Sequence, residues 1–229
     1  YTWTVPAGSS LLSGQGSTGI EVNWIAAPGG NVCVAANSGC GTGPQQCFPV
    51  LVNPTPLANA GADGAVCGTT FTLNATGNGV WTTLAGPGSA AFVNANSNNT
   101  DVTASQHGLY VFQWEETIAG CSGADTVAVR FNAAPVAGAV LETCDAANEN
   151  YTVTIPISGG LAPYSVNANP VAGSSFVSAP LANGTTYSFT ISDANGCTAG
   201  PVTGAFSCNC ATNAGQMNLQ ALSACAGDS

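Results

Sequence analysis

Two sequence marks recur along this chain at a nearly constant spacing. Three Ala-Gly pairs that each precede a cysteine begin at Ala60, Ala137 and Ala214, 77 residues apart. A Gly-Cys pair falls late in each period, at residues 39–40, 120–121 and 196–197, with spacings of 81 and 76 residues. A period of this length is too long for a solenoid coil and suits a small domain with its own core. The chain is therefore expected to consist of tandem copies of one module, which favours reach, adhesion or assembly over a single active site.

Charged side chains are scarce. Among 229 residues there is no lysine, one arginine, one histidine and 11 acidic residues, which gives a formal net charge of −10. Such a chain cannot neutralise the phosphates of a nucleic acid and has no basic patch for anionic lipid. Its hydrophobic fraction of 45% favours folded domains over disorder. No apolar run approaches transmembrane length and no signal peptide is recognisable, so we expect an internal piece of a longer secreted protein, without membrane insertion.

The ten cysteines indicate disulfides. They form no CxxC pair, and His107 is the only imidazole in the chain, so a zinc site is the weaker interpretation. Disulfides persist in oxidising compartments. The cysteines therefore predict a secreted protein that is extracellular or on the outer cell surface.

The residue pattern predicts an all-β chain. Helical periodicity is absent, and short alternating runs rich in Val, Thr, Phe and Tyr are separated by Gly, Asn and Pro turns. Linkers are expected at residues 53–56, 132–135 and 207–210, the first two because proline stops sheet pairing. They divide the chain into blocks 1–53, 54–133 and 134–208 and a stub, 209–229. The main predicted strands are 70–75, 79–83, 101–103, 108–117, 125–132, 151–157, 164–168, 186–192 and 202–206.

Two long strands share one aromatic pattern. Tyr110 and Phe112 in one, and Tyr187 and Phe189 in the other, lie two residues apart, so both rings of each pair face the same side of the sheet. A tyrosine at this place is similar to the tyrosine corner of immunoglobulin-like sandwiches. Trp81 and Trp3 occupy the position of a central core tryptophan and are predicted to pack in the core.

Several segments resemble modules of large secreted Bacteroidota proteins. Residues 1–8, 13–17 and 22–24 resemble the PKD-like domain of these proteins. Residues 159–164 and 193–197 are similar to repeats of the SprB-type gliding adhesin, and the middle block, from residue 59 to 121, is similar to Ig-like repeats. The resemblance covers nearly the whole chain. It implies tandem immunoglobulin-like (PKD-like) β-sandwich domains, export by the type IX system and a cell-surface or extracellular location, and it supplies no catalytic residues.

No catalytic constellation is expected. A nucleophile needs a neighbouring base, and His107 stands at a strand entrance, where a turn role suffices. Glu115 and Glu116 are the only adjacent carboxylates, and consecutive strand residues point to opposite faces, so they cannot act as a glycosidase pair. The chain is therefore predicted not to be an enzyme and to need no cofactor.

Four short patterns allow weaker binding or modification hypotheses. Asp145 and Glu149 could join a calcium site at a domain junction, although a solvated loop is the simpler interpretation. Trp24 and Trp114 are the candidates for an exposed aromatic surface that binds surface glycans, with core packing as the alternative. Residues 125–127 fit a short O-glycosylation pattern, for which an ordinary strand is the alternative. Residues 193–196 predict a turn closed by the Asp and Asn side chains.

Disulfide connectivity is partly open from the sequence alone. Cys33 and Cys47 lie on neighbouring strands of one hairpin and are expected to pair, with Cys40 at the tip. Cys67 and Cys121 are expected to pair within the middle block. However, a sandwich puts these two turns at opposite ends, which would favour Cys197 as the partner of Cys67. Cys144 can pair with Cys197 or with Cys208.

The two ends are expected to be parts of one sandwich. Aligning Trp3 with Trp81 and Cys225 with Cys67 leaves seven residues missing between the stub and the first block. Each part alone would expose unpaired strand edges and half a core. A segment at residues 216–225 is therefore predicted to pack on the first block of another copy, or of a further repeat of the same polypeptide. Its assembly side chains are Gln216, Leu219, Leu222 and Cys225.

These observations predict a structural or adhesive repeat of a long extracellular fibre. Head-to-tail contacts that do not close into a ring generate a filament. The partners would be other copies or further repeats, with no nucleic acid among them. The alternative is an accessory carbohydrate- or calcium-binding module of a secreted multidomain protein.

Overall fold

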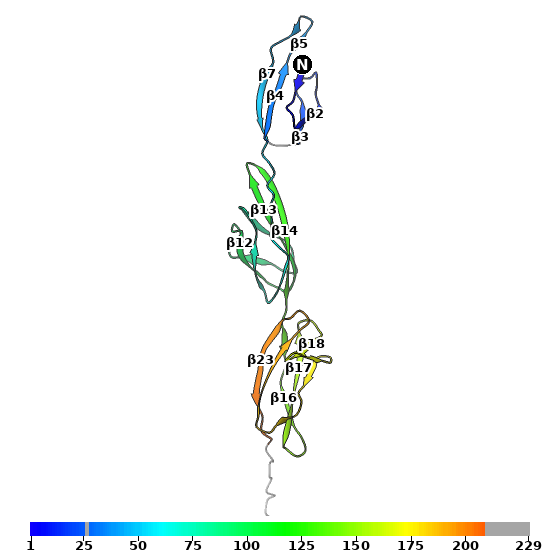
Figure 1. The fold of residues 1–229 in the computed structure, drawn as a ribbon, viewed down its shortest axis with the longest axis vertical. Helices are drawn as coiled ribbons and strands as arrows, with labels where there is room; N and C mark the ends of the chain where they lie inside the picture. Colours follow the sequence, from blue (N-terminus) through cyan, green and yellow to red (C-terminus); the bar gives the residue numbers. More distant parts are fainter. Residues whose placement is uncertain (26–27, 209–229) are drawn as a thin grey trace, which may run out of the picture. The chain divides into compact units, whose positions relative to one another are not determined.

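The computed structural model describes residues 1–25 and 28–208, and every regular element in these ranges is a β-strand (Figure 1). The chain divides into two compact units between Asn132 and Ala133, beside the predicted boundary. The first unit holds two sets of sheets that share no strand. Residues 1–53 are termed the first domain, 54–132 the second and 133–208 the third. The predicted assembly side chains Gln216, Leu219, Leu222 and Cys225 lie outside the described residues.

The second domain is a two-sheet sandwich of immunoglobulin-like topology. One sheet has the order β10–β13–β14–β8 and the other the order β11–β12–β9. β8 runs parallel to β14, and the remaining neighbours are antiparallel. Each strand predicted here is present, although β14 begins at Cys121 rather than at residue 125. The strands are β8 (Gly64–Cys67), β9 (Thr70–Asn74), β10 (Gly79–Ala85), β11 (Ala90–Phe92), β12 (Asn99–Ala104), β13 (Gly108–Ile118) and β14 (Cys121–Asn132).

Alternation along β13 builds the core of the second domain. Tyr110, Phe112 and Trp114 all point inward, and each is buried completely. Trp81 on β10 is opposite Trp114 in the register, with ring centroids 5.1 Å apart, so its predicted core position is confirmed. The Tyr110 hydroxyl, however, has no hydrogen-bond partner among the described residues, so the tyrosine corner expected there does not form.

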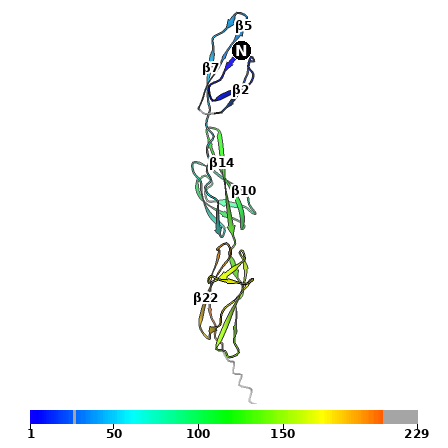
Figure 2. The same ribbon diagram turned by 45° about the vertical axis from the view of Figure 1, so that its right-hand side comes forward.

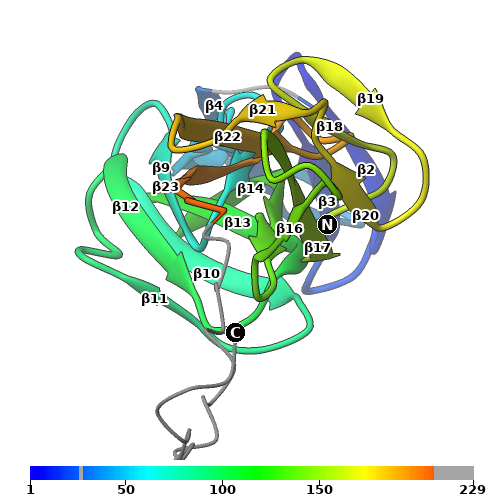
Figure 3. The same ribbon diagram turned by 90° about the horizontal axis from the view of Figure 1, so that it is seen from below.

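The third domain is a second two-sheet sandwich. β17 pairs with β15 and β16 on one edge and with β20 and β21 on the other, and the second sheet has the order β19–β18–β22–β23. Figure 3 shows β22 and β23 side by side. The strands are β15 (Pro135–Ala137), β16 (Leu141–Cys144), β17 (Asn150–Gly159), β18 (Tyr164–Val166), β19 (Asn169–Val171), β20 (Ser175–Val177), β21 (Leu181–Ala182), β22 (Thr186–Ser192) and β23 (Thr198–Ala205).

A tyrosine also anchors the core of the third domain. Tyr187 stacks on Phe189, with ring centroids 5.5 Å apart, as their spacing predicted. Its hydroxyl donates to Glu142 Oε1 at 2.7 Å, a side-chain acceptor in place of the backbone acceptor of a tyrosine corner. This hydrogen bond, with burial and the negative charge of Glu142, raises the pKa of Tyr187 to about 12. The proton is therefore held firmly in the bond at neutral pH.

The first domain has fewer strands than the other two. Its main sheet has the order β1–β4–β7, and two hairpins, β2–β3 and β5–β6, accompany it. In Figure 2, β2 and β7 lie on opposite sides of the domain. No described residue of this domain is buried. The strands are β1 (Thr2–Thr4), β2 (Ser9–Ser13), β3 (Glu21–Trp24), β4 (Gly29–Ala35), β5 (Asn37–Ser38), β6 (Gly41–Thr42) and β7 (Gln46–Leu51).

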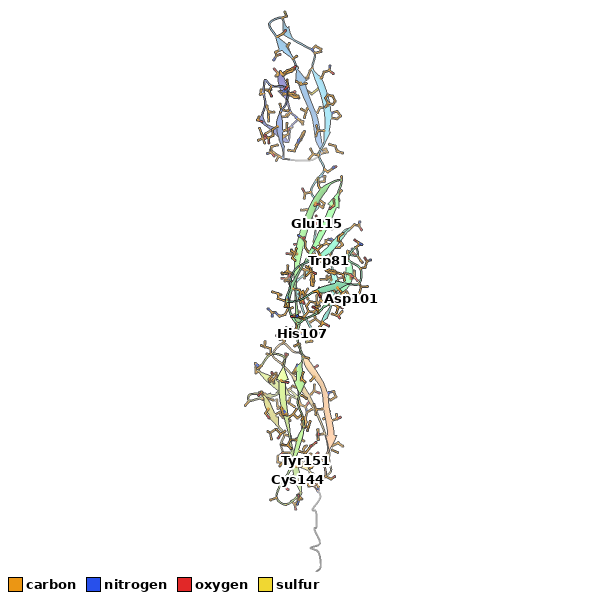
Figure 4. All side chains as sticks on the ribbon, turned by 180° about the vertical axis from the view of Figure 1, so that it is seen from behind. Trp81, Asp101, His107, Glu115, Cys144 and Tyr151 are labelled. Atoms are coloured by element: carbon orange, nitrogen blue, oxygen red, sulfur yellow. A yellow bond between two sulfur atoms is a disulfide. The ribbon has the colours of Figure 1, made fainter. Side chains whose placement is uncertain are left out.

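Two disulfides follow the sheet register. Cys33 and Cys47 are opposite each other in the β4–β7 pair and are bonded, as predicted, with Cys40 in the turn between β5 and β6. Cys144 is bonded to Cys208, which confirms one of its two predicted partners. Figure 4 shows Cys144 beside Tyr151, its register partner, at one end of the third domain.

The predicted Cys67–Cys121 pairing is wrong. Cys121 is a free thiol, whereas Cys67 is disulfide-bonded. Cys67 ends β8 opposite Asn132, at the end of β14, and Cys121 begins β14. Eleven residues of strand separate these points, or about 36 Å at a rise of about 3.3 Å per residue. A cystine requires Cα atoms within about 7 Å, so the opposite-ends geometry of the sandwich prevails over pairing within one domain.

A core substitution tests this packing. Leu73 on β9 is 0% exposed, and Leu57, in the segment before the second domain's strands, is 95% exposed. We expect Leu73→Ala to lower the unfolding free energy of the second domain by about 2–5 kcal/mol, and Leu57→Ala to change it by less than about 0.5 kcal/mol. Urea unfolding followed by the fluorescence of the buried Trp81 and Trp114 measures both. Equal effects of the two variants would contradict the core assignment.

Removing a disulfide tests how far the third domain depends on it. The Cys144–Cys208 bond closes a 64-residue separation, and the chain-entropy argument predicts a loss of about 4 kcal/mol when both cysteines become serine. Cys40→Ser is the control, because Cys40 is an exposed free thiol. Calorimetry should show one melting transition shifted down in the double variant and none shifted in the control. An unshifted transition in the double variant would mean that the core alone suffices.

Candidate functional site

The first domain corresponds strand by strand to part of the second. Trp3 is opposite Val34 in the β1–β4 register, as Trp81 is opposite Trp114 in the β10–β13 register. Following both registers outward makes β1, β4 and β7 the counterparts of β10, β13 and β14, and Asn53 the counterpart of Asn132. The β2–β3 hairpin takes the place of β11 and β12. Counterparts of β8 and β9 are absent from the described part of the first domain.

The inner face of this partial sandwich is uncovered. Phe48 on β7 is the counterpart of Val127 on β14, and the two side chains are 72% and 1% exposed. Val50 is half-buried, whereas its counterpart Val129 is completely buried. In the second domain this inner face is covered by β9, whose Leu73 belongs to the same core cluster as Val127. The first domain has no such strand among its described residues. The exposure of Phe48 is thus the direct consequence of a missing strand.

The outer edge of β7 is also unpaired. The corresponding edge of β14 carries β8, which pairs with residues 129–132 in parallel. In the first domain β7 has β4 as its only strand partner among the described residues. An unpaired edge presents a row of backbone N–H and C=O groups that can accept another strand. The candidate functional site is therefore this open edge, β7 with Val52 and Asn53, together with the uncovered Phe48 beside it.

A free thiol lies where the open edge ends. Cys121, at the start of β14, is half-buried, and its Sγ is 3.6 Å from the carbonyl oxygen of Asn53. The side-chain amide of Asn53 donates to the carbonyl of Ala119 at 3.3 Å in the same turn. Asn53 thus joins the end of the first domain to the β13–β14 turn of the second. This contact was not predicted from the sequence, because the Gly-Cys mark shows where the turn is but not what it touches.

The residues considered for catalysis do not form a site together. His107 is exposed in the bend before β13, and Glu115 lies toward the other end of that strand (Figure 4). Glu115 is exposed and Glu116 is 8% exposed, so they point to opposite faces, as predicted. The Glu116 carboxylate accepts a hydrogen bond from Trp114 Nε1 at 3.1 Å, which gives it a structural partner.

The Asp145 carboxylate is used within its own loop. It accepts hydrogen bonds from the backbone amides of Glu149 and Asn150, at 3.0 and 3.2 Å, and from the Asn150 side chain at 3.1 Å. The side-chain bond from Asn150 is the main cause that lowers the pKa of Asp145. Within residues 1–25 and 28–208, no group of three or more His, Cys, Asp or Glu side chains is arranged to hold a metal ion.

Two further segments considered for binding or modification, residues 193–196 and 125–127, form a turn and part of a strand. The Asp193 carboxylate accepts from the backbone amides of Asn195 and Cys197, at 2.9 and 2.8 Å, and Gly196 has a φ of +78°, which confirms the predicted turn. Asp125 accepts from the Ala60 amide at 2.9 Å. This bond ties β14 to the segment before β8 and leaves Thr126 exposed on the strand.

The proposed aromatic sugar-binding surface loses one member. Trp114 is buried, and its ring nitrogen donates to the carbonyl of Thr76 at 2.8 Å, which confirms core packing as the interpretation of this residue. Trp24 is half-buried on β3. A groove in the third domain has a volume of about 570 Å³ and a lining that includes Val171, Phe176 and Phe189. Of its three polar lining residues, Asn169, Ser175 and Ser178, the last already accepts a hydrogen bond from the Val153 amide at 2.9 Å.

Residues 1–50 match the family model of the PKD-like domain. No curated protein matches the sequence. The eight N-terminal Ig domains of Down syndrome cell adhesion molecule align with 90% of this chain at 12% identity, with a TM-score of 0.48, and this chain spans 37% of that chain. A three-domain I-band fragment of titin aligns over 90% of this chain and 86% of its own, at 11% identity and a TM-score of 0.43.

The fold and the disulfides together define the class of module. The chain consists of tandem immunoglobulin-like and PKD-like β-sandwiches. Six of the eight cysteines within the described residues are disulfide-bonded, which is consistent with an extracellular domain. No helix in the described ranges has the length and apolar character needed to cross a membrane. The first domain is therefore similar to PKD-like domains, and the edge of its β7 lacks the parallel strand that β8 supplies to β14 in the second domain.

Proposed function

We propose that the chain is a structural or adhesive repeat of a long extracellular fibre. One observation carries this proposal: the first domain presents Phe48 and the edge of β7, whose counterparts in the second domain are covered. An exposed strand edge beside an apolar face is costly in a monomer and suits strand addition between chains or repeats. The tandem period and the disulfides support a load-bearing, extracellular role.

The partners in this proposal are other copies of the chain or further repeats of the same polypeptide. Each contact joins two different surfaces, the open edge of one unit and a strand of the next. Contacts of this heterologous kind generate a filament unless the rotation closes a ring. In this proposal the chain has no catalytic role and needs no cofactor. Asp145 and Asp193 bind backbone amides of their own loops, and Glu116 and Glu142 accept hydrogen bonds from aromatic side chains.

Carbohydrate binding is a weaker second candidate. It would require an exposed aromatic platform, and Trp114 is buried in the core. The groove of the third domain is mainly apolar, so it offers a sugar few hydrogen-bond partners. No observation favours this function over assembly.

A charge placed on the uncovered face tests the proposal. Phe48→Glu would bury a carboxylate without a partner in the assembled domain, which is unfavourable. We expect the wild-type chain to self-associate and Phe48→Glu to weaken the association at least about tenfold, which corresponds to about 1.4 kcal/mol. Leu57→Glu is the matched control, because Leu57 is exposed outside the open edge. Sedimentation velocity over a concentration series and electron microscopy measure the outcome.

Two results would contradict the proposal. A wild-type chain that stays monomeric at the highest attainable concentration would remove its basis. Association that Phe48→Glu and Leu57→Glu weaken equally would place the contact elsewhere on the molecule.

A further inference from the structure

The sheet register specifies how a strand would add to β7. In the second domain β8 places residues 64–67 opposite residues 129–132 of β14, with Cys67 opposite Asn132. Because Asn53 is the counterpart of Asn132, an added strand would pair with residues 50–53 and end opposite Asn53. This pairing rests on the proposed assembly and specifies its register.

One segment of the chain has the pattern that this register needs. Aligning Cys225 with Cys67 places Leu222, Ser223 and Ala224 opposite residues 50–52. On β8 the first and third residues are half-buried and the second is exposed. Leu222 and Ala224 are apolar and Ser223 is polar, so the segment alternates in the same phase. The occupant inferred for the open edge is therefore the segment 216–226 of a second copy.

The same register brings Cys225 to Cys121. In the second domain the amide after Cys67, that of Gly68, donates to the carbonyl of Asn132 at 2.9 Å. In the first domain the corresponding carbonyl, that of Asn53, is 3.6 Å from Cys121 Sγ. A strand that donates to this carbonyl from residue 226 places Cys225 beside the thiol. Parallel neighbours lie about 4.8 Å apart, so Cys225 would lie one strand spacing from Asn53. The Asn53 carbonyl is also the group that Cys121 Sγ contacts, so both cysteines would meet at the same carbonyl.

The structural counterparts of both cysteines are oxidised. Cys67, the counterpart of Cys225, is disulfide-bonded. Cys197 stands at the start of the last strand of the third domain, as Cys121 does in the second, and it is disulfide-bonded too. Cys121 is free. Cys121 thus occupies a disulfide position and has no bonded partner within the described residues.

We propose that strand addition at β7 is locked by a disulfide between Cys121 of one copy and Cys225 of the next. Two thiols lose two protons and two electrons as the S–S bond forms. The acceptor is a disulfide of a dithiol oxidase or of an oxidised low-molecular-weight thiol, which is reduced to two thiols. The repeat would then be joined covalently at each junction, and a reductant would remove this covalent link while the strand pairing remains.

The test oxidises the full chain with a buffer of reduced and oxidised glutathione. We expect a ladder of covalent oligomers on non-reducing gels. Peptic peptides prepared in acid, where thiol exchange is slow, should contain Cys121 joined to Cys225. Cys121→Ser and Cys225→Ser should each stay uncrosslinked alone. Mixed together they should give a covalent dimer and nothing larger, because only one junction is complete. Cys40→Ser, which removes the other described free thiol, should leave the ladder unchanged.

Several outcomes would overturn the inference. A Cys210–Cys225 bond, a Cys121–Cys225 bond within one chain, or a free Cys121 in the oxidised assembly would each contradict it. Sedimentation in excess reductant separates this failure from that of the proposed function. If the chain associates in excess reductant but forms no Cys121–Cys225 bond when oxidised, the proposed disulfide is wrong and the fibre proposal stands. Loss of association in both conditions removes both.

Discussion

Burial of one sheet against another is the interaction on which each of these domains depends. The chain has few charges and little other means of holding a fold, so a sandwich is stable where two apolar faces meet. In the second domain Trp81, Trp114 and Leu73 lie between the sheets and are shielded from water. In the first domain the sheet β1–β4–β7 provides one apolar face, and the β2–β3 hairpin covers part of it. Its open edge lacks a counterpart of β8, and its uncovered Phe48 lacks a counterpart of β9, which belong to different sheets of the second domain.

The disulfides stabilise these small domains in different ways. Cys33–Cys47 links neighbouring strands across one hairpin and closes a separation of 14 residues. Cys144–Cys208 joins the start of the third domain to its end and closes a separation of 64 residues, so it restricts the unfolded chain more. Cys121 stands apart from both, a free thiol at the boundary between the first and second domains. In the proposed assembly, Cys121 gains its partner only when a second copy is present.

Strand alternation made much of this fold predictable, and the limits of that prediction are physical. Tyr110, Phe112 and Trp114 are two residues apart, so period two places all three on the core side. The same spacing decides between the two interpretations of Trp114 in favour of core packing. The Cys33–Cys47 bond followed from one hairpin. The Cys67–Cys121 error arose because sequence separation does not tell which end of a sandwich a turn occupies. The contact between Asn53 and Cys121 depends on how two domains meet, which no local pattern encodes.

Hydrogen exchange along β7 tests the central claim most directly. The amides of Cys47 and Leu51 point away from β4 and have no strand partner among the described residues, and Pro49 between them has no N–H. We predict that peptides covering residues 46–53 exchange rapidly in dilute monomer and slow strongly as the chain associates. Peptides from β20, in the third domain, should not change. Association without added protection at residues 46–53 would contradict the claim that a strand completes the first domain.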